Sequence, residues 1–147
     1  MFKVHEIEFI TYCHATEDCS RVLNALKNLL PPSIRDKTSF THQTLHGYYG
    51  NPITIYSTKI REYAEQLIEY LADQFNESEK AILSATLELR YDRRTNKLYL
   101  RVSKQEAYNK KIVLYDSDDV IKIVISFKNG RGLNKVREYL KSMRLIK

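Results

Sequence analysis

The chain has 147 residues, 43% of them hydrophobic, which suits one ordinary globular domain spanning residues 1–147. No run of about 18 apolar residues is available to cross a bilayer. Charges at Lys3, Glu6 and Glu8 exclude the apolar core of a secretory signal, so we expect a cytoplasmic protein without a membrane partner.

Strand and helix patterns alternate at the start of the chain. Residues 3–13 have a period of two, which predicts a half-buried strand. Thr16 is a candidate N-cap for the helix that follows, and Pro31-Pro32 ends that helix. Cys13 and Cys19 are too few for a disulfide scaffold and lack the two-residue gap of zinc ribbons. We therefore interpret both cysteines as small packing residues.

A hairpin and an amphipathic helix come next. The Thr-rich residues 37–46 and the segment after residues 47–52 read as two strands joined by a glycine-containing reversal. Residues 59–75 have a helical apolar stripe. The side of this helix opposite the stripe is acidic and consists of Glu62, Glu65, Glu69 and Asp73.

The second half predicts another hairpin. Ser78 is a candidate cap for a short helix to Leu83, after which residues 87–91 and 97–102 alternate as two strands. A short extended piece near residues 111–115 and a strong strand over 120–127 follow, before a final helix. The predicted order is β-α-β-β-α-α-β-β-(β)-β-α, an α+β domain whose largely antiparallel sheet has helices packed on one face.

The predicted second hairpin carries a candidate RNA-binding surface. Its alternation turns Leu89, Tyr91, Leu98 and Leu100 toward the core and places Arg90, Lys97, Tyr99 and Arg101 on the other face. Bases stack on aromatic rings while cations hold phosphates, so this mixture suits single-stranded or looped RNA. Arg93, Arg94 and Lys104 would extend the band. The alternative is an ordinary solvated face.

The C-terminal segment, residues 128–147, carries the whole formal net charge of +6, because its only acid is Glu138. Such a localised charge raises the local concentration of a polyanion. The alternative is a solvated basic helix that keeps the protein soluble. We expect this segment and the hairpin to form one shared track for RNA. The phosphate-binding candidates in the segment are Lys128, Arg131, Lys135, Arg137 and Lys141.

The first hairpin has a Gly-x-x-Gly loop with two adjacent tyrosines, Tyr48 and Tyr49, between Gly47 and Gly50. Glycines let backbone amides approach phosphates, but hairpin reversals use the same residues. A structural turn is therefore the favoured explanation of the glycines. Two adjacent large rings rarely both face a core, so one tyrosine is a candidate stacking platform.

Candidate metal and catalytic residues are few. Asp116, Asp118 and Asp119 are of the type that holds Mg²⁺ in nucleases, or they form an acidic loop before the last strand. Among the histidines, His14 is the one worth testing, and a local hydrogen-bonding role explains it. There is no Walker loop, dinucleotide fingerprint or nucleophile elbow. The sequence predicts no cofactor, no bound metal and no catalytic residue.

Four stretches together resemble an archaeal family of small RNA-binding proteins described as a predicted exosome subunit. They are HATED at 14–18, GYYGNPI at 47–53, LRVSKQEAY at 100–108 and DDVI at 118–121. The resemblance covers about residues 3–127. It implies a fold similar to the fifth large-subunit ribosomal protein and likened to double-stranded-RNA-binding domains. It also implies partners in a multi-subunit RNA-degrading complex, but it supplies no catalytic residue and leaves out the basic segment.

These observations predict a non-catalytic RNA-binding protein that acts as an accessory in archaeal RNA processing or degradation. Two alternatives stay open. The acidic helix face and the basic last helix are complementary, so the chain is alternatively an interaction module or homodimer. The aspartate loop leaves a metal-dependent nuclease as the third class.

Overall fold

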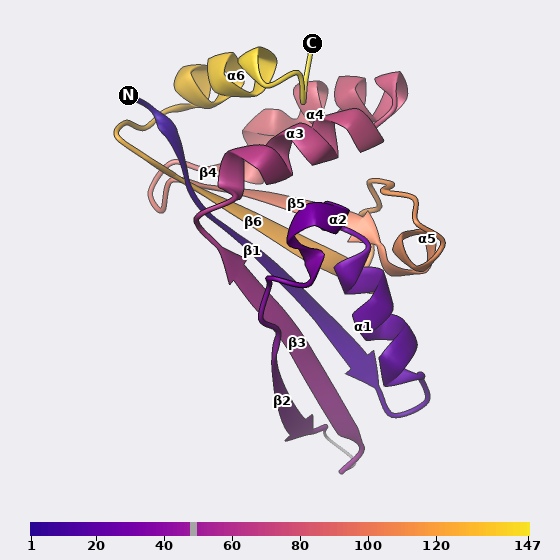
Figure 1. Ribbon diagram of the computed structural model, residues 1–147. Coiled ribbons are helices and arrows are strands. Elements are labelled where there is room, and N and C mark those ends of the chain that lie inside the picture. Colours follow the sequence, from indigo (N-terminus) through magenta and orange to yellow (C-terminus); the bar gives the residue numbers. More distant parts are fainter. Residues whose placement is uncertain (48–49) are drawn as a thin grey trace.

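The fold is built on a six-stranded sheet in which neighbouring strands pair antiparallel, in the order β2-β3-β1-β6-β5-β4. The computed structural model describes residues 1–47 and 50–147, and Figure 1 shows their arrangement. The strands are β1 (Lys3–His14), β2 (Thr41–His46), β3 (Pro52–Ile60), β4 (Tyr91–Asp92), β5 (Lys97–Ser103) and β6 (Val120–Lys128). The helices are α1 (Cys19–Lys27), α2 (Pro32–Arg35), α3 (Ala64–Gln74), α4 (Glu77–Arg90), α5 (Lys104–Tyr108) and α6 (Leu133–Ser142).

The two faces of the sheet differ because side chains alternate along each strand. In β1, Ile7 and Phe9 are fully buried, whereas Ile10 and Tyr12 on the opposite face are only partly buried. In β6, Lys122 lies on the same side as Ile10, its partner in register. The helices lie on the other side of the sheet (Figure 1). The predicted α+β class, with an antiparallel sheet and helices on one face, is confirmed, and we call the uncovered side the open face.

The predicted second hairpin is largely wrong, because α4 continues to Arg90. The observed N-cap, Asn76, lies two residues before the predicted cap. The Asn76 side chain accepts from the Glu79 backbone and the Glu79 side chain accepts from the Asn76 backbone, a capping box that satisfies two free donors. Only Tyr91 and Asp92 remain to pair with β5. Leu89, predicted to face the core, is 87% exposed.

Several element boundaries also differ from the predictions. Asp18, not Thr16, caps α1, because its carboxylate accepts from the Ser20 backbone. β3 continues to Ile60, so α3 starts at Ala64 and not at residue 59. The extended piece at 111–115 contributes one isolated bridge, between Leu114 and Val102, and forms no strand. The strands over 3–14 and 120–128 and the last helix agree with the pattern that predicted them.

The two cysteines form a disulfide, so their interpretation as separate packing residues was wrong. Cys13 is the second-to-last residue of β1 and Cys19 is the first residue of α1, and a Cys13–Cys19 bond joins their sulfur atoms. The turn between strand and helix brings their Cα atoms to 5.5 Å, within the range that a disulfide spans. The bond therefore fixes the start of α1 against the end of β1.

The helices in the described part of the chain lack the length and apolar character needed for a membrane span.

Candidate nucleic-acid interface

Cationic and aromatic side chains from three neighbouring strands meet on the open face. Arg101 of β5 lies opposite Lys122 of β6 in the register of the sheet. The Lys122 ammonium lies 5.7 Å from the centre of the Tyr12 ring of β1. Tyr99 shares the face with Arg101 and is 43% exposed. We call the set the open-face strip, and it consists of Tyr12, Lys97, Tyr99, Arg101 and Lys122.

The sequence predicted the β5 part of this strip and missed the rest. Lys97, Tyr99 and Arg101 lie on one face, as their alternation predicted. Tyr12 alternates with the buried residues Thr11 and Cys13, and Lys122 lies between Ile121 and Ile123, so the period of two in the sequence could have placed both on the open face. What the local pattern does not give is that β6 lies between β1 and β5, and this order brings the two residues to the strip.

Acids on the open face are matched by neighbouring cations. The Glu6 carboxylate accepts from the Arg61 guanidinium at 2.9 Å. Glu8 lies opposite Lys59 of β3 in register. The positive character of the open face therefore lies on the β5 and β6 side of the sheet.

Arg90 does not belong to the sheet face on which it was predicted. It is the last residue of α4, and its side chain is only 9% exposed. Two of its nitrogens contact the two carboxylate oxygens of Asp116, at 3.1 and 3.3 Å, and its Nε donates to the Thr86 hydroxyl at 2.8 Å. Arg90 therefore serves to hold the loop at Asp116, and its charge is balanced within the protein.

Lys104 is buried, so its predicted place in an exposed basic band was wrong. Only 6% of its side chain is exposed, and its ammonium donates to the backbone oxygen of Tyr12 at 2.7 Å. The same ammonium lies 3.0 Å from the Glu17 carboxylate and 2.8 Å from that of Asp119. Because these partners come from β1, the β1–α1 turn and the loop before β6, Lys104 ties three segments together.

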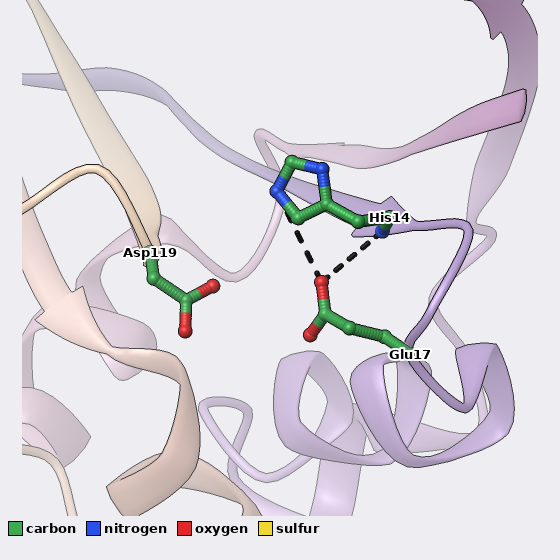
Figure 2. Close-up of side chains that lie close together, drawn as sticks. All are labelled: His14, Glu17 and Asp119. Atoms are coloured by element: carbon green, nitrogen blue, oxygen red, sulfur yellow. Dashed lines mark hydrogen bonds and ion pairs between the residues drawn. The ribbon is translucent and has the colours of Figure 1, made fainter. Parts of the chain in front are cut away.

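Potential metal ligands gather around this lysine. His14, Glu17 and Asp119 each offer an atom within 4.8 Å of the others (Figure 2). The His14 backbone N–H already donates to Glu17 Oε1 at 3.1 Å. Because the Lys104 ammonium contacts both carboxylates, a divalent cation there would meet a fixed positive charge on the same oxygens. These residues do not fit a metal centre.

The aspartates considered for a nuclease do not share one site. Asp116 pairs with Arg90, whereas Asp119 pairs with Lys104. Asp118 is exposed. A two-metal or single-metal hydrolase needs carboxylates that converge on one ion, and these diverge toward different cations.

The turn cations lie at one end of the sheet, next to the loop that leads to α6. Arg93 and Arg94 are exposed in the turn between β4 and β5. The Arg131 guanidinium donates to both of their backbone oxygens, at 2.9 and 2.6 Å. Asn96 of the turn donates to the backbone oxygens of Phe127 and of Gly130, at 3.0 and 2.7 Å. The two loops are interlocked, and Arg131 therefore has a structural role in addition to its charge.

The basic helix α6 lies on the helix-covered side of the sheet, away from the open-face strip (Figure 1). Its Tyr139 ring packs edge-on against Phe127 at 6.0 Å between ring centres, and Phe127 is buried on the core side of β6. The prediction that hairpin and terminal cations form one shared track is therefore wrong for the α6 cations Lys135, Arg137 and Lys141, whereas Lys128 ends β6 and Arg131 contacts the hairpin turn. Among the terminal cations, Arg137 donates to Ser84 of α4, whereas Lys128, Lys135 and Lys141 are exposed.

The acidic face of α3 lies close to α6 within the same chain. Burial, together with the nearby carboxylates of Glu65 and Glu69, raises the pKa of Tyr139 to about 12. Lys147, near the end of the chain, pairs with Glu77 of α4. The Lys147–Glu77 pair joins the end of the chain to α4 and not to α3, so the complementarity of the acidic and basic helices stays open as an argument for an interaction between two copies.

Tyr48 and Tyr49 lie outside the described residues. The flanking glycines form a tight reversal, in which the Gly50 N–H donates to the Gly47 carbonyl at 2.8 Å and the Gly47 N–H donates to the Asn51 carbonyl at 2.7 Å. Gly50 has φ of +80°, a conformation that favours glycine. The glycines are thus accounted for by the hairpin, and the stacking role of the tyrosines stays a prediction.

Comparisons with known proteins agree on one family. A family model described as RNA binding matches residues 6–127. RNA-binding protein PAB1135 from Pyrococcus abyssi is 32% identical over 146 residues, with 94% of each chain covered. Protein MJ0213 from Methanocaldococcus jannaschii is 30% identical over 134 residues, with 90% of each covered. The solved structure of protein SSO0741 from Sulfolobus solfataricus has a TM-score of 0.79 and 28% identity, and the match covers 95% of this chain and 96% of that one. Since the family model spans well over half of the sequence, the chain belongs to this RNA-binding family.

Proposed function

We propose that this chain binds single-stranded or looped RNA through the open-face strip. The observation that carries the proposal is the neighbourhood of Tyr12, Lys122, Arg101 and Tyr99 on a sheet face that none of the helices described in the structure covers. Each base stacked on an aromatic ring contributes about 1–3 kcal/mol, and adjacent Lys and Arg neutralise phosphates. Bases in a duplex offer no free faces for stacking, so the strip favours unpaired nucleotides.

Family membership supports the same ligand. The family is described as RNA binding, and a relative with 32% identity carries the name RNA-binding protein. The strip holds backbone and ring faces, which all nucleotides share, so we expect low sequence preference from the strip itself.

The cellular role that we propose is non-catalytic. The chain would act in the archaeal cytoplasm as an accessory of RNA processing or degradation, where it holds RNA for a separate enzyme. Support comes from the sequence resemblance to the predicted exosome subunits and from the diverging partners of Asp116 and Asp119. Pull-down of an RNA-degrading complex with the tagged protein tests the accessory role.

Two pairs of charge variants test which cations meet the RNA. Lys122→Gln with Arg101→Gln removes two charges from the strip, and Lys135→Gln with Lys141→Gln removes two from α6. Each neutralised phosphate contributes about 0.7 to the slope of log affinity against log salt for single strands, so the strip pair should lower the slope by about 1.4. Titrations of fluorescent oligo(U) at several salt concentrations measure it.

The α6 pair is the matched control, because it makes the same change in net charge. We expect it to change the slope by well under 1, since α6 lies on the helix-covered side. A flattened slope with the α6 pair and an unchanged slope with the strip pair would assign RNA binding to the C-terminal helix. Binding that does not depend on salt in either case would exclude phosphate contacts altogether.

A further inference from the structure

A surface hollow opens beside the open-face strip, at the outer edge of β5. β4 pairs with Leu98 and Lys97, and the chain at Leu114 and Tyr115 contacts Val102 and Arg101 further along the strand. The hollow lies at Tyr99, between these two contacts, and has a volume of about 430 Å³. Its lining consists of Thr86, Leu89, Arg90, Tyr99, Arg101 and Asp116.

Two of the side chains that line the hollow are apolar or aromatic and are exposed to solvent. Leu89 at the end of α4 is 87% exposed and Tyr99 is 43% exposed, and both line it. A ring that enters the hollow would cover apolar surface of Leu89 and stack against Tyr99. Arg101 belongs to both the hollow and the open-face strip, so the backbone of RNA on the strip would pass directly beside it.

The hydrogen-bond acceptor that we consider at the rim is the Asp116 carboxylate, which Arg90 holds in place. Arg90 contacts each oxygen of the Asp116 carboxylate, and Arg90 is itself held by the Thr86 hydroxyl. That hydroxyl donates to the Ile82 backbone oxygen at 2.7 Å. The Asp116 side chain remains 66% exposed, so each of its oxygens keeps a free lone pair toward solvent. A carboxylate accepts hydrogen bonds and donates none, which selects a ligand with a hydrogen-bond donor, and an exocyclic amino group projects from the edge of a base and offers two N–H bonds.

We propose that the hollow binds one unpaired base of the RNA, and that the base carries an exocyclic amino group. The inference rests on the proposed function, because the strip supplies the RNA backbone. The ring stacks on Tyr99 beside Leu89, and the amino group donates to Asp116. The ligand class is thus single-stranded RNA with an amino-bearing base splayed out of the strand.

The test uses the full chain and oligo(U) nonamers that differ only at the central nucleotide. This nucleotide is uridine, adenosine or purine riboside, which keeps the adenine ring but lacks the amino group. We expect the adenosine nonamer to bind about tenfold tighter than the purine riboside nonamer, the size of one hydrogen bond to a charged acceptor. Fluorescence anisotropy at constant salt gives the three affinities.

Two variants with matched controls test whether the preference for adenosine arises in the hollow. Asp116→Ala should remove the difference between adenosine and purine riboside, whereas Asp118→Ala, with the same charge change in the same loop, should keep it. Leu89→Ser should weaken the adenosine nonamer about fivefold and leave the uridine nonamer unchanged. Ile82→Ser is its control, because Ile82 is 48% exposed on the same helix but does not line the hollow.

The outcomes separate this inference from the proposed function. Equal affinity for adenosine and purine riboside, or a difference that persists in Asp116→Ala, overturns the base site. The strip is upheld independently if the salt slope of oligo(U) binding falls in the strip pair and not in the α6 pair. If none of the nonamers binds, the proposed function fails and the base site fails with it. Thermal unfolding of each variant shows that the altered affinity belongs to a folded chain.

Discussion

Replacement of both Tyr12 and Tyr99 by alanine is expected to weaken binding of oligo(U) at least about thirtyfold. Two stacked bases at about 1–3 kcal/mol each account for this loss, since every factor of ten costs about 1.4 kcal/mol. Both rings lie on the uncovered side of the sheet, and Tyr99 is 43% exposed, so the folded structure should persist. Fluorescence anisotropy gives the affinity and thermal unfolding gives the stability.

The control for this variant keeps the rings. Tyr12→Phe with Tyr99→Phe removes two hydroxyl groups and leaves the stacking faces, so it should bind within about twofold of the wild type. Equal loss in the Phe and Ala variants would mean that the hydroxyls, not the rings, hold RNA. Wild-type affinity in the Ala variant would mean that the two tyrosines do not contact the RNA.

Lys104→Met is expected to lower the free energy of unfolding by about 2–4 kcal/mol. The methionine keeps the apolar stem but leaves the carboxylates of Glu17 and Asp119, with ligand atoms within 4.8 Å of each other, without their cation. It also leaves the Tyr12 backbone oxygen without its donor. Because both acids are partly exposed, water recovers part of the loss, and the expected cost stays below that of a fully buried pair.

Denaturant unfolding measures this cost, with Lys111→Met as the control on an exposed lysine of the same region. The folded Lys104→Met protein should bind oligo(U) as the wild type does, since Lys104 lies outside the open-face strip. A stability within about 0.5 kcal/mol of the wild type would contradict the role of Lys104 as a tie between segments. A stable variant that binds RNA weakly would mean that Lys104 takes part in RNA binding.

The regular strands could be predicted because burial of one face imposes a period of two. Ile7 and Phe9 in β1 and Ile123 and Ile125 in β6 show this pattern, and all four are fully buried. The prediction of the second hairpin was wrong for a related reason. Leu83 and Leu87 are spaced for a helix, whereas the spacing from Leu87 to Leu89 also fits a strand, and the capping box at Asn76 decides in favour of α4.

Three of the five residues of the open-face strip could be predicted from local pattern. Tyr99 and Arg101 share a face because they are two residues apart in one strand. Tyr12 and Lys122 join them only through the order of strands in the sheet, which depends on long-range pairing. In the same way, charge counting identified the basic last helix but could not assign it to the helix-covered side, because that placement depends on the packing of Tyr139 against Phe127.

Photocrosslinking tests the central claim most directly, because it reports which surface touches the RNA. The wild-type chain, bound to an oligonucleotide that contains 4-thiouridine, would be irradiated and digested, and the modified peptides identified by mass spectrometry. We predict crosslinks in the peptides that carry Tyr12 and Tyr99. Crosslinks confined to residues 133–147, with none in β1 or β5, would contradict binding on the open face.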